Sequence, residues 1–170
     1  YDVRFPDLFT TLADRGAVPA TQITLEDIAF LQYTGGTTGV SKGAILTHGN
    51  MCANTVQVSE WLAPITDPNR QEVLIGALPM YHIFALTACT FVFVNYGSRI
   101  VLIPNPKDFA GFIKTLSKLP FSVLPGVNTL FNALVNHPDF AKLDFSNLRL
   151  AIGGGMAVQR ATAEKWKAVT

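Results

Sequence analysis

The sequence is most informative at Tyr33-Thr34-Gly35-Gly36-Thr37-Thr38-Gly39-Val40-Ser41-Lys42-Gly43-Ala44. These twelve residues contain four glycines, five hydroxyl groups and one lysine, and they come soon after the apolar run 28–31. Glycines allow backbone N–H groups to surround an anion, hydroxyl groups donate further hydrogen bonds, and the lysine adds a mobile positive charge. The stretch therefore predicts a loop that follows a strand and holds a polyphosphate.

The composition is that of a protein with a substantial core and few charges. The 170 residues suffice for one domain. Hydrophobic residues make up 49% of the chain and charged residues 15%, so we expect another part of the protein to cover some apolar surface. A net charge of +1 gives no basic patch and argues against nucleic-acid binding. Cys52 and Cys89 lack the spacing of a metal site or a disulfide framework, and we predict reduced, buried thiols in a cytosolic protein.

Neither a membrane span nor a signal peptide is expected. The most apolar run, 83–94, is interrupted by Thr87 and Thr90 and is shorter than the ~20 residues that span a bilayer. No charged segment followed by an apolar one stands at the start. Because the chain begins at Tyr1 without a methionine and stops at Thr170 inside a predicted helix, we expect an excerpt of a longer protein.

Strand and helix patterns alternate along the chain, which predicts an α/β fold. The predicted strands are 28–32, 73–78, 99–103, 121–124 and 148–152, and the predicted helices are 5–12, 82–96, 109–119, 127–135, 157–169 and one that Thr47 or Asn50 caps and that ends near Leu62. Continuously apolar strands favour a mostly parallel sheet covered by helices on both faces. Because ligands bind at the carboxyl ends of such strands, the glycine loop, the turn at 79–82 and the triple glycine at 153–155 are predicted to share one rim.

Three motifs together resemble a known family. In the common P-loop the lysine stands in Gly-Lys-Ser/Thr, whereas Lys42 follows Ser41 and precedes Gly43. The spacing instead resembles the phosphate loop of the adenylate-forming superfamily, which comprises acyl-CoA synthetases, luciferases and the adenylation domains of peptide synthetases. A solvated turn would not need so many hydroxyl groups. The motif at 78–84 and Gly153-Gly154-Gly155-Met156 resemble two further motifs of this family. Within the family, the segment 126–134 and the triple glycine are most similar to bacterial long-chain-fatty-acid–CoA ligases.

The resemblance assigns roles to individual residues. It implies that Lys42 meets the β- and γ-phosphates, that Thr37 helps to hold Mg²⁺, and that His82 faces the carboxylate and the α-phosphate, so that His82 and Lys42 are the catalytic candidates. A histidine beside an apolar helix is more often structural, which is the alternative for His82. The other residues implied to bind ATP are Thr34, Gly35, Gly36, Thr38, Gly39 and Ser41. Those implied to contact the acyl substrate, with His82, are Phe84, Leu86, Gly153, Gly154, Gly155 and Met156.

The resemblance also implies an activity for the parent protein. Residues 1–170 would be part of the large N-terminal, AMP-binding domain, with the C-terminal domain absent. The expected reaction is ATP- and Mg²⁺-dependent activation of a medium- or long-chain fatty acid to an acyl-adenylate and then to acyl-CoA, with coenzyme A as co-substrate. The excerpt alone is expected to be inactive, because the acidic metal motif, the ribose-binding aspartate, the hinge and the adenylation lysine cannot be placed in it.

Two classes of alternative stay open. One is another adenylate-forming enzyme: an aryl-CoA ligase, a luciferase-like enzyme or a peptide-synthetase adenylation domain. The other is a non-catalytic, nucleotide-binding fragment. For the ligase, the expected partners are a fatty acid, ATP and CoA, without nucleic acid and with no oligomeric state implied. The expected location is the cytoplasm. Peripheral association of the parent protein with the inner face of the membrane is also compatible with this expectation.

Overall fold

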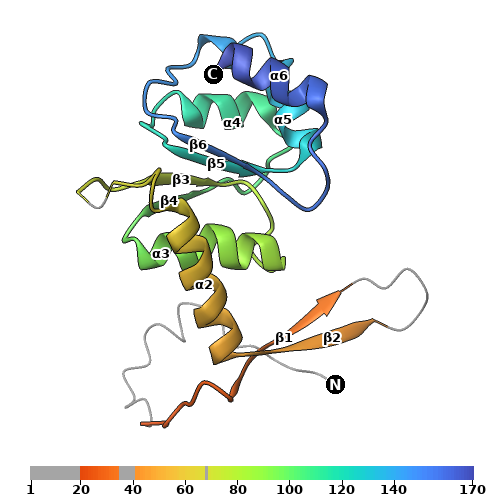
Figure 1. The fold of residues 1–170 in the computed structure, drawn as a ribbon. Helices are drawn as coiled ribbons and strands as arrows, with labels where there is room; N and C mark the ends of the chain where they lie inside the picture. Colours follow the sequence, from red (N-terminus) through yellow and green to blue (C-terminus); the bar gives the residue numbers. More distant parts are fainter. Residues whose placement is uncertain (1–19, 35–40, 68) are drawn as a thin grey trace, which may run out of the picture.

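The computed structural model describes residues 20–34, 41–67 and 69–170, and within them the chain forms two sheets joined by a helix (Figure 1). The first sheet is an antiparallel hairpin of β1 (Ile28–Thr34) and β2 (Lys42–Thr47). The second is a four-stranded parallel sheet in the order β4-β3-β5-β6. Its strands are β3 (Val73–Gly76), β4 (Arg99–Leu102), β5 (Val123–Gly126) and β6 (Leu150–Gly153).

Helices cover both faces of the parallel sheet, as the sequence predicted (Figure 1). One face carries α4 (Phe109–Leu116), α5 (Asn128–Val135), the short 3₁₀-helix η2 (Phe140–Lys142) and α6 (Arg160–Val169). The other carries the π-helix η1 (Ala85–Phe91), α3 (Val92–Asn95) and the end of α2 (His48–Leu62), which connects the hairpin to the sheet. Among the described residues, no helix is both long enough and apolar enough to cross a bilayer.

Side-chain caps explain where two of these helices begin. The Thr47 hydroxyl accepts the N–H of Asn50 at 3.2 Å, and the Asn50 side chain accepts the N–H of Thr47 at 3.0 Å. The two candidates for the cap of α2 therefore form one reciprocal capping box. At the start of α4, the Asp108 carboxylate accepts the N–H of Gly111 at 3.0 Å.

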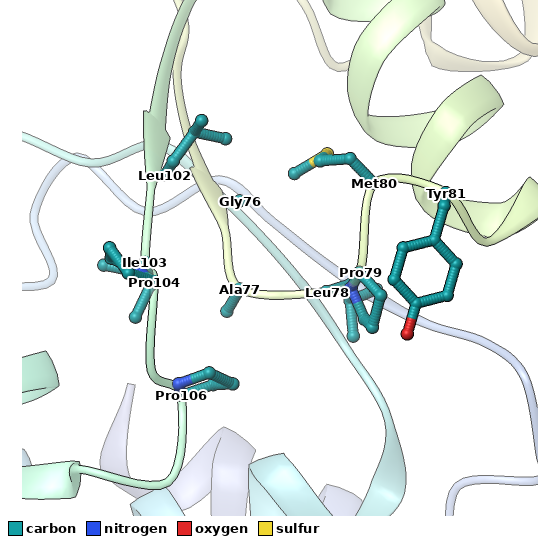
Figure 2. A pocket seen from close by; sticks show the side chains of 10 residues that line it. All are labelled: Gly76, Ala77, Leu78, Pro79, Met80, Tyr81, Leu102, Ile103, Pro104 and Pro106. Carbon is teal, nitrogen blue, oxygen red and sulfur yellow. The ribbon is translucent and has the colours of Figure 1, made fainter. Parts of the chain in front are cut away.

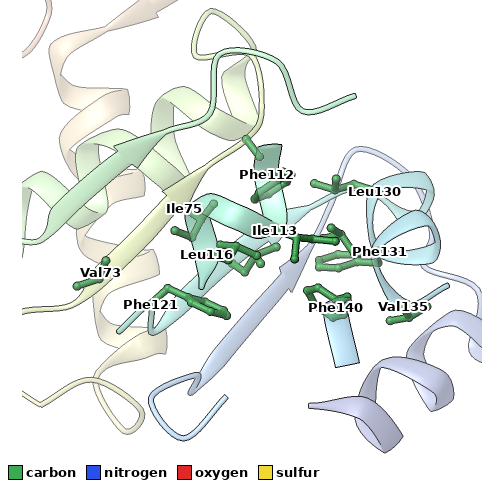
Figure 3. Packing of buried hydrophobic residues seen from close by; sticks show 13 residues of the cluster. Val73, Ile75, Phe112, Ile113, Leu116, Phe121, Leu130, Phe131, Val135 and Phe140 are labelled. Atoms are coloured by element: carbon green, nitrogen blue, oxygen red, sulfur yellow. The ribbon is translucent and has the colours of Figure 1, made fainter. Parts of the chain in front are cut away.

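Two apolar clusters fix the helices to the sheet. Figure 3 shows the larger one, in which Phe112, Phe121 and Phe131 pack between the sheet and its helices. Trp166 of α6 closes this cluster at a ring-centroid distance of 4.8 Å from Phe131. The smaller cluster lies on the opposite face and consists of Leu62, Leu74, Ala85, Cys89, Val92, Phe93 and Val123. The sheet is therefore a rigid platform for the loops at its carboxyl edge.

Part of the predicted topology is wrong. The strand predicted at 28–32 lies outside the parallel sheet, because it pairs with β2, a strand that the sequence pattern did not predict. The segment 35–41 between the two strands is much shorter than the dozen or more residues that a parallel crossover needs, so an antiparallel return is the natural geometry. The helix predicted over 82–96 begins at Ile83 and is π-helical over Ala85–Phe91. The helix predicted over 5–12 lies outside the described residues.

The two cysteines differ in environment. Cys89 is fully buried, as predicted, and burial raises the pKa of its thiol to about 12. Cys52 is exposed on α2, so its predicted burial is wrong. The physical reason is that α2 buries only Met51 and Leu62 below the surface and leaves most of its other side chains in contact with water.

Candidate active site

The hairpin places two predicted site residues opposite each other at the base of the glycine loop. Strands β1 and β2 stay paired up to Thr34 and Lys42, which are direct partners across the ladder. Lys42 and Ser41 are exposed, as residues that meet a ligand must be. The remaining predicted phosphate-binding residues lie outside the described part of the chain: Gly35, Gly36, Thr37, Thr38 and Gly39.

The turn after β3 fixes the orientation of the His82 ring. The N–H of His82 donates to the carbonyl of Pro79 at 3.0 Å, and the N–H of Leu86 donates to the carbonyl of His82 at 2.9 Å. The His82 Nδ1 accepts the N–H of Phe84 at 3.2 Å. A neutral imidazole that accepts at Nδ1 carries its proton on Nε2, so Nε2–H is left to donate to an oxygen of a ligand. Because His82 is exposed, a ligand can reach that group.

The glycine turn after β6 lies directly against this motif. The N–H of Gly154 donates to the carbonyl of Gly126, at the end of β5, at 3.2 Å. The Phe84 ring covers Gly154 so closely that a Cβ there would come within 2.6 Å of the ring. Gly155 has φ +75°, in the left-handed region that glycine adopts without strain. The close contact with the Phe84 ring at Gly154 and the positive φ at Gly155 explain why larger residues do not fit at these two positions.

The two motifs line an open cavity of about 250 Å³ at the carboxyl edge of the sheet. Of the predicted substrate residues, His82, Phe84, Gly155 and Met156 line this cavity, and Gly154 lies behind the Phe84 ring. The cavity walls also include Leu78, Pro79 and Val127, which the sequence analysis did not single out as contacts. Their signal was present, because Leu78 and Pro79 begin the motif at 78–84 and Val127 belongs to the segment 126–134 that resembles fatty-acid ligases.

Two predicted substrate residues lie elsewhere. Leu86 is half-buried on η1 and does not line the cavity with His82. Gly153 lines a separate, smaller cavity of about 170 Å³ beneath α6, next to Val158 and Trp166. The contact of these two residues with substrate stays a prediction.

A second cavity, of about 350 Å³, lies beside the same turn (Figure 2). It runs from Gly76 and Ala77 across to the segment after β4, and the turn after β3 forms the wall between the two cavities. In Figure 2 the Met80 and Tyr81 side chains point in different directions from this turn. Its lining is apolar and rich in proline: Gly76, Ala77, Leu78, Pro79, Met80, Tyr81, Leu102, Ile103, Pro104 and Pro106.

The hairpin also touches the turn that carries His82. The Gln32 side chain donates from Nε2 to the carbonyl of Tyr81 at 3.2 Å. The Phe30 and Phe91 rings meet edge to face, with centroids 5.9 Å apart. The base of the glycine loop is therefore joined to the rim of the parallel sheet, although β1 is not one of its strands. The sequence analysis missed Gln32, whose only signal is its position just before Thr34.

Comparison with known proteins agrees with this geometry. The sequence matches the AMP-binding enzyme family over residues 4–170. A protein from Yersinia pestis named long-chain-fatty-acid–CoA ligase is 57% identical over 85% of this chain and 25% of its own length. A protein of the same name from Haemophilus influenzae is 52% identical over 88% of this chain and 27% of its own length.

A solved structure has the same fold. ATP-bound MatB from Rhodopseudomonas palustris superposes with a TM-score of 0.76 at 30% identity, over 89% of this chain and 29% of MatB. The chain spans about a quarter of the length of the curated relatives that it matches. Since the family match extends over nearly all of its residues, the chain belongs to the family of AMP-binding enzymes.

Proposed function

We propose that this chain is part of a long-chain-fatty-acid–CoA ligase, for which it supplies the triphosphate loop and one side of the acyl site. The observation that supports this most is the cavity where His82 faces the glycine turn, next to the hairpin that carries the loop. Relatives that are 52–57% identical over most of the chain carry the same name. A cytoplasmic enzyme that meets its substrate at the inner face of a membrane fits a long-chain acid and is part of the proposal.

The geometry supports acyl-adenylate formation in the following way. A fatty-acid carboxylate oxygen forms a bond to the α-phosphorus of ATP, while the bond from that phosphorus to the β-phosphate oxygen breaks and pyrophosphate leaves. The Nε2–H of His82 donates to the carboxylate or to the α-phosphate oxygens and so orients the attack. Lys42 offsets the charge of the leaving pyrophosphate. The thiol of CoA then displaces AMP from the acyl-adenylate.

Apolar side chains around His82 form a surface to which the acyl group can bind. Phe84, Val127 and Met156 line the cavity together with Leu78 and Pro79. Excluding water from this wall strengthens the hydrogen bond that His82 donates and protects the acyl-adenylate from hydrolysis. The chain length that is accepted would depend on how far this apolar wall continues.

Mg²⁺ would neutralise the triphosphate when bound. Thr37 is the residue of this chain assigned to the ion, and that role stays a prediction. Within the described ranges no three His, Cys, Asp or Glu side chains gather into a group that could hold a metal. We therefore assign only orientation and charge compensation to the residues of this chain, and ATP and CoA enter as substrates.

Product analysis of the full-length protein tests the proposed reaction. With ATP, Mg²⁺ and CoA, we expect AMP and the CoA thioester of palmitate by mass spectrometry, and far less product from 4-coumarate or from amino acids. Residues 1–170 alone should form neither acyl-adenylate nor acyl-CoA. A thioester of 4-coumarate as the main product would replace the proposal with an aryl-CoA ligase. Absence of any adenylate would favour the non-catalytic alternative.

Lys42→Ala tests the assignment of the glycine loop. We expect the KM for ATP to rise about tenfold, the factor that one charge-assisted hydrogen bond to phosphate is worth. Steady-state kinetics with several fatty acids should show an unchanged chain-length preference, because Lys42 lies on the hairpin and not at the apolar cavity. Lys114→Ala, which removes an exposed lysine from α4, is the control. A changed chain-length preference with an unchanged KM for ATP would contradict the assignment.

A further inference from the structure

We propose that Gln32 is a positioning residue that holds the glycine-loop hairpin at a fixed distance from His82. The inference rests on the proposed function and names a residue to which none of the motifs assigns a role. Gln32 lies two residues before Thr34, where the loop begins. Its side chain donates to the carbonyl of Tyr81, the residue directly before His82. One hydrogen bond therefore connects the backbone that leads to the triphosphate with the backbone that carries the carboxylate-binding ring.

The turn that Gln32 contacts is held firmly from its other side. The Thr90 hydroxyl lies 3.2 Å from the carbonyl of Ala85 and 3.5 Å from the sulfur of Met80. The Met80 methyl group packs against Gly76, where a Cβ would come within 2.7 Å of it. The N–H of His82 is bonded to Pro79. Contacts with the π-helix and with β3 therefore hold the turn in place, and the Tyr81 carbonyl that Gln32 bonds to belongs to this well-held segment.

The hairpin needs the contact more than the turn does. Of the described side chains on the hairpin, Leu31, Tyr33 and Ile45 are exposed, so they do not anchor it to the sheet. Gln32 faces the small residue Ala44 across the ladder, which leaves room for its side chain to reach the turn. Phe30 adds an apolar contact to Phe91 but permits sliding, because ring contacts tolerate a range of offsets. The directional bond from Gln32 is what sets the position of the hairpin along the rim.

Position matters here because the proposed reaction is an in-line attack. The loop would place the α-phosphorus, and His82 would place the carboxylate. A shift of the hairpin relative to the His82 turn therefore changes the distance between the carboxylate oxygen and the α-phosphorus by a similar amount. Loss of the Gln32 bond should therefore lower kcat for acyl-adenylate formation and leave the KM values of ATP and fatty acid nearly unchanged. If the bond only stabilised the folded protein, its loss would not lower kcat while leaving both KM values unchanged.

The chain contains a close match for use as a control. The Gln71 side chain donates from Nε2 to the carbonyl of Gly97 at 3.1 Å, and it too is a long-range bond from a glutamine to a backbone carbonyl. Gln71 precedes β3 at the amino edge of the sheet, opposite the candidate active site. Methionine is unbranched and close in size to glutamine but cannot donate a hydrogen bond, so Gln32→Met and Gln71→Met each remove one long-range bond to a backbone carbonyl. Gln32→Met also removes a longer contact of 3.5 Å from Nε2 to the carbonyl of the neighbouring Tyr33.

The experiment measures pre-steady-state acyl-adenylate formation in the full-length protein with ATP and palmitate. We expect Gln32→Met to lower kcat roughly fivefold to tenfold, the factor that one neutral hydrogen bond is worth. Gln32→Asn, whose amide is one methylene short of Tyr81, should show a similar loss, and Gln71→Met should match the wild type. An unchanged kcat in Gln32→Met, an equal loss in Gln71→Met, or a loss that appears as a higher KM would overturn the proposal.

Hydrogen exchange separates failure of this inference from failure of the proposed function. In the unliganded protein, the amides of the peptide 79–86 should exchange faster in Gln32→Met than in the wild type and stay unchanged in Gln71→Met. If the wild type forms no acyl-adenylate and this pattern is seen, the proposed reaction fails while the contact between hairpin and turn stands. If the peptide 79–86 exchanges at the same rate in all three proteins, then the Gln32 bond does not stabilise the turn, and the proposed positioning role is wrong.

Discussion

Replacement of His82 by alanine is expected to slow acyl-adenylate formation about 10²-fold in the full-length enzyme, the size of effect that a positioned catalytic group supplies. The ring is exposed, and its backbone contact leaves Nε2–H to meet the carboxylate or the α-phosphate. Because little apolar surface is lost, the free energy of unfolding should change by no more than about 0.5 kcal/mol. Single-turnover kinetics and thermal unfolding measure the two quantities.

A second variant distinguishes a catalytic role for His82 from a structural one. In His82→Asn the side-chain oxygen can still accept the N–H of Phe84, as asparagine does in turns, but the Nε2–H donor is lost. We expect this variant to be as slow as the alanine variant. If it keeps the wild-type rate, then His82 serves only to shape the turn.

His137 is a matched control within the same chain. Its Nδ1 accepts the N–H of Asp139 at 3.2 Å, the same local contact that His82 makes with Phe84 two residues on. His137 lies after α5, away from the candidate site. His137→Ala should therefore leave adenylate formation unchanged, and an equal loss of rate in both variants would point to a general effect of disturbing such turns.

Local patterns predicted most of the sheet and much of the site, because the information lies in contiguous residues. Apolar runs ended by proline or glycine identified the four parallel strands. Gly154 comes directly after β6, and His82 lies in the turn that follows β3. The sequence also offered Thr47 and Asn50 as alternative caps of α2, and the structure shows that the two residues cap it together. These features depend on spacing along the chain, which the sequence displays directly.

Other features could not be predicted, because they depend on contacts between distant segments. Strand β2 begins with a lysine and a glycine, and its pairing with β1 is what makes it a strand. Within η1 the Thr90 hydroxyl reaches the carbonyl of Ala85, five residues earlier, and the π-helical geometry has no signal in the sequence. The bond between Gln32 and Tyr81 joins residues that are 49 positions apart. Each of these needs the tertiary structure to be known first.

The ion pair between Glu72 and Arg149 is another such contact, and it carries the largest expected effect on stability. Glu72 precedes β3 and Arg149 precedes β6, while β5 lies between the two strands. The carbonyl of Ser122, just before β5, accepts the N–H of Arg149 at 2.9 Å, and the Ser122 hydroxyl accepts the N–H of Val73 at 2.9 Å. This network joins the amino ends of three strands at the edge of the sheet opposite the candidate site.

Replacement of Arg149 by methionine should lower the free energy of unfolding of the sheet by about 3–5 kcal/mol, because it leaves a buried carboxylate without its partner. The Glu72 side chain is 4% exposed and that of Arg149 27%, so water can compensate only part of the loss. In native-state hydrogen exchange, the peptides that span β3 and β6 should exchange at least about a hundredfold faster. The double variant Glu72→Met and Arg149→Met removes both charges and should recover much of the stability.

Arg160→Met is the control for the loss of an arginine and of an ion pair. Arg160 bonds to Glu164 at 2.7 Å on α6, but its side chain is 91% exposed, and such surface pairs contribute about 0–1 kcal/mol. If Arg149→Met is as harmless as Arg160→Met, then water must reach Glu72 and the ion pair does not stabilise the sheet. If it is strongly destabilising and the double variant is not, then the cost comes from the unpaired charge. Strands β3 and β6, which lead to the His82 turn and to the glycine turn, would then keep their register without the pair.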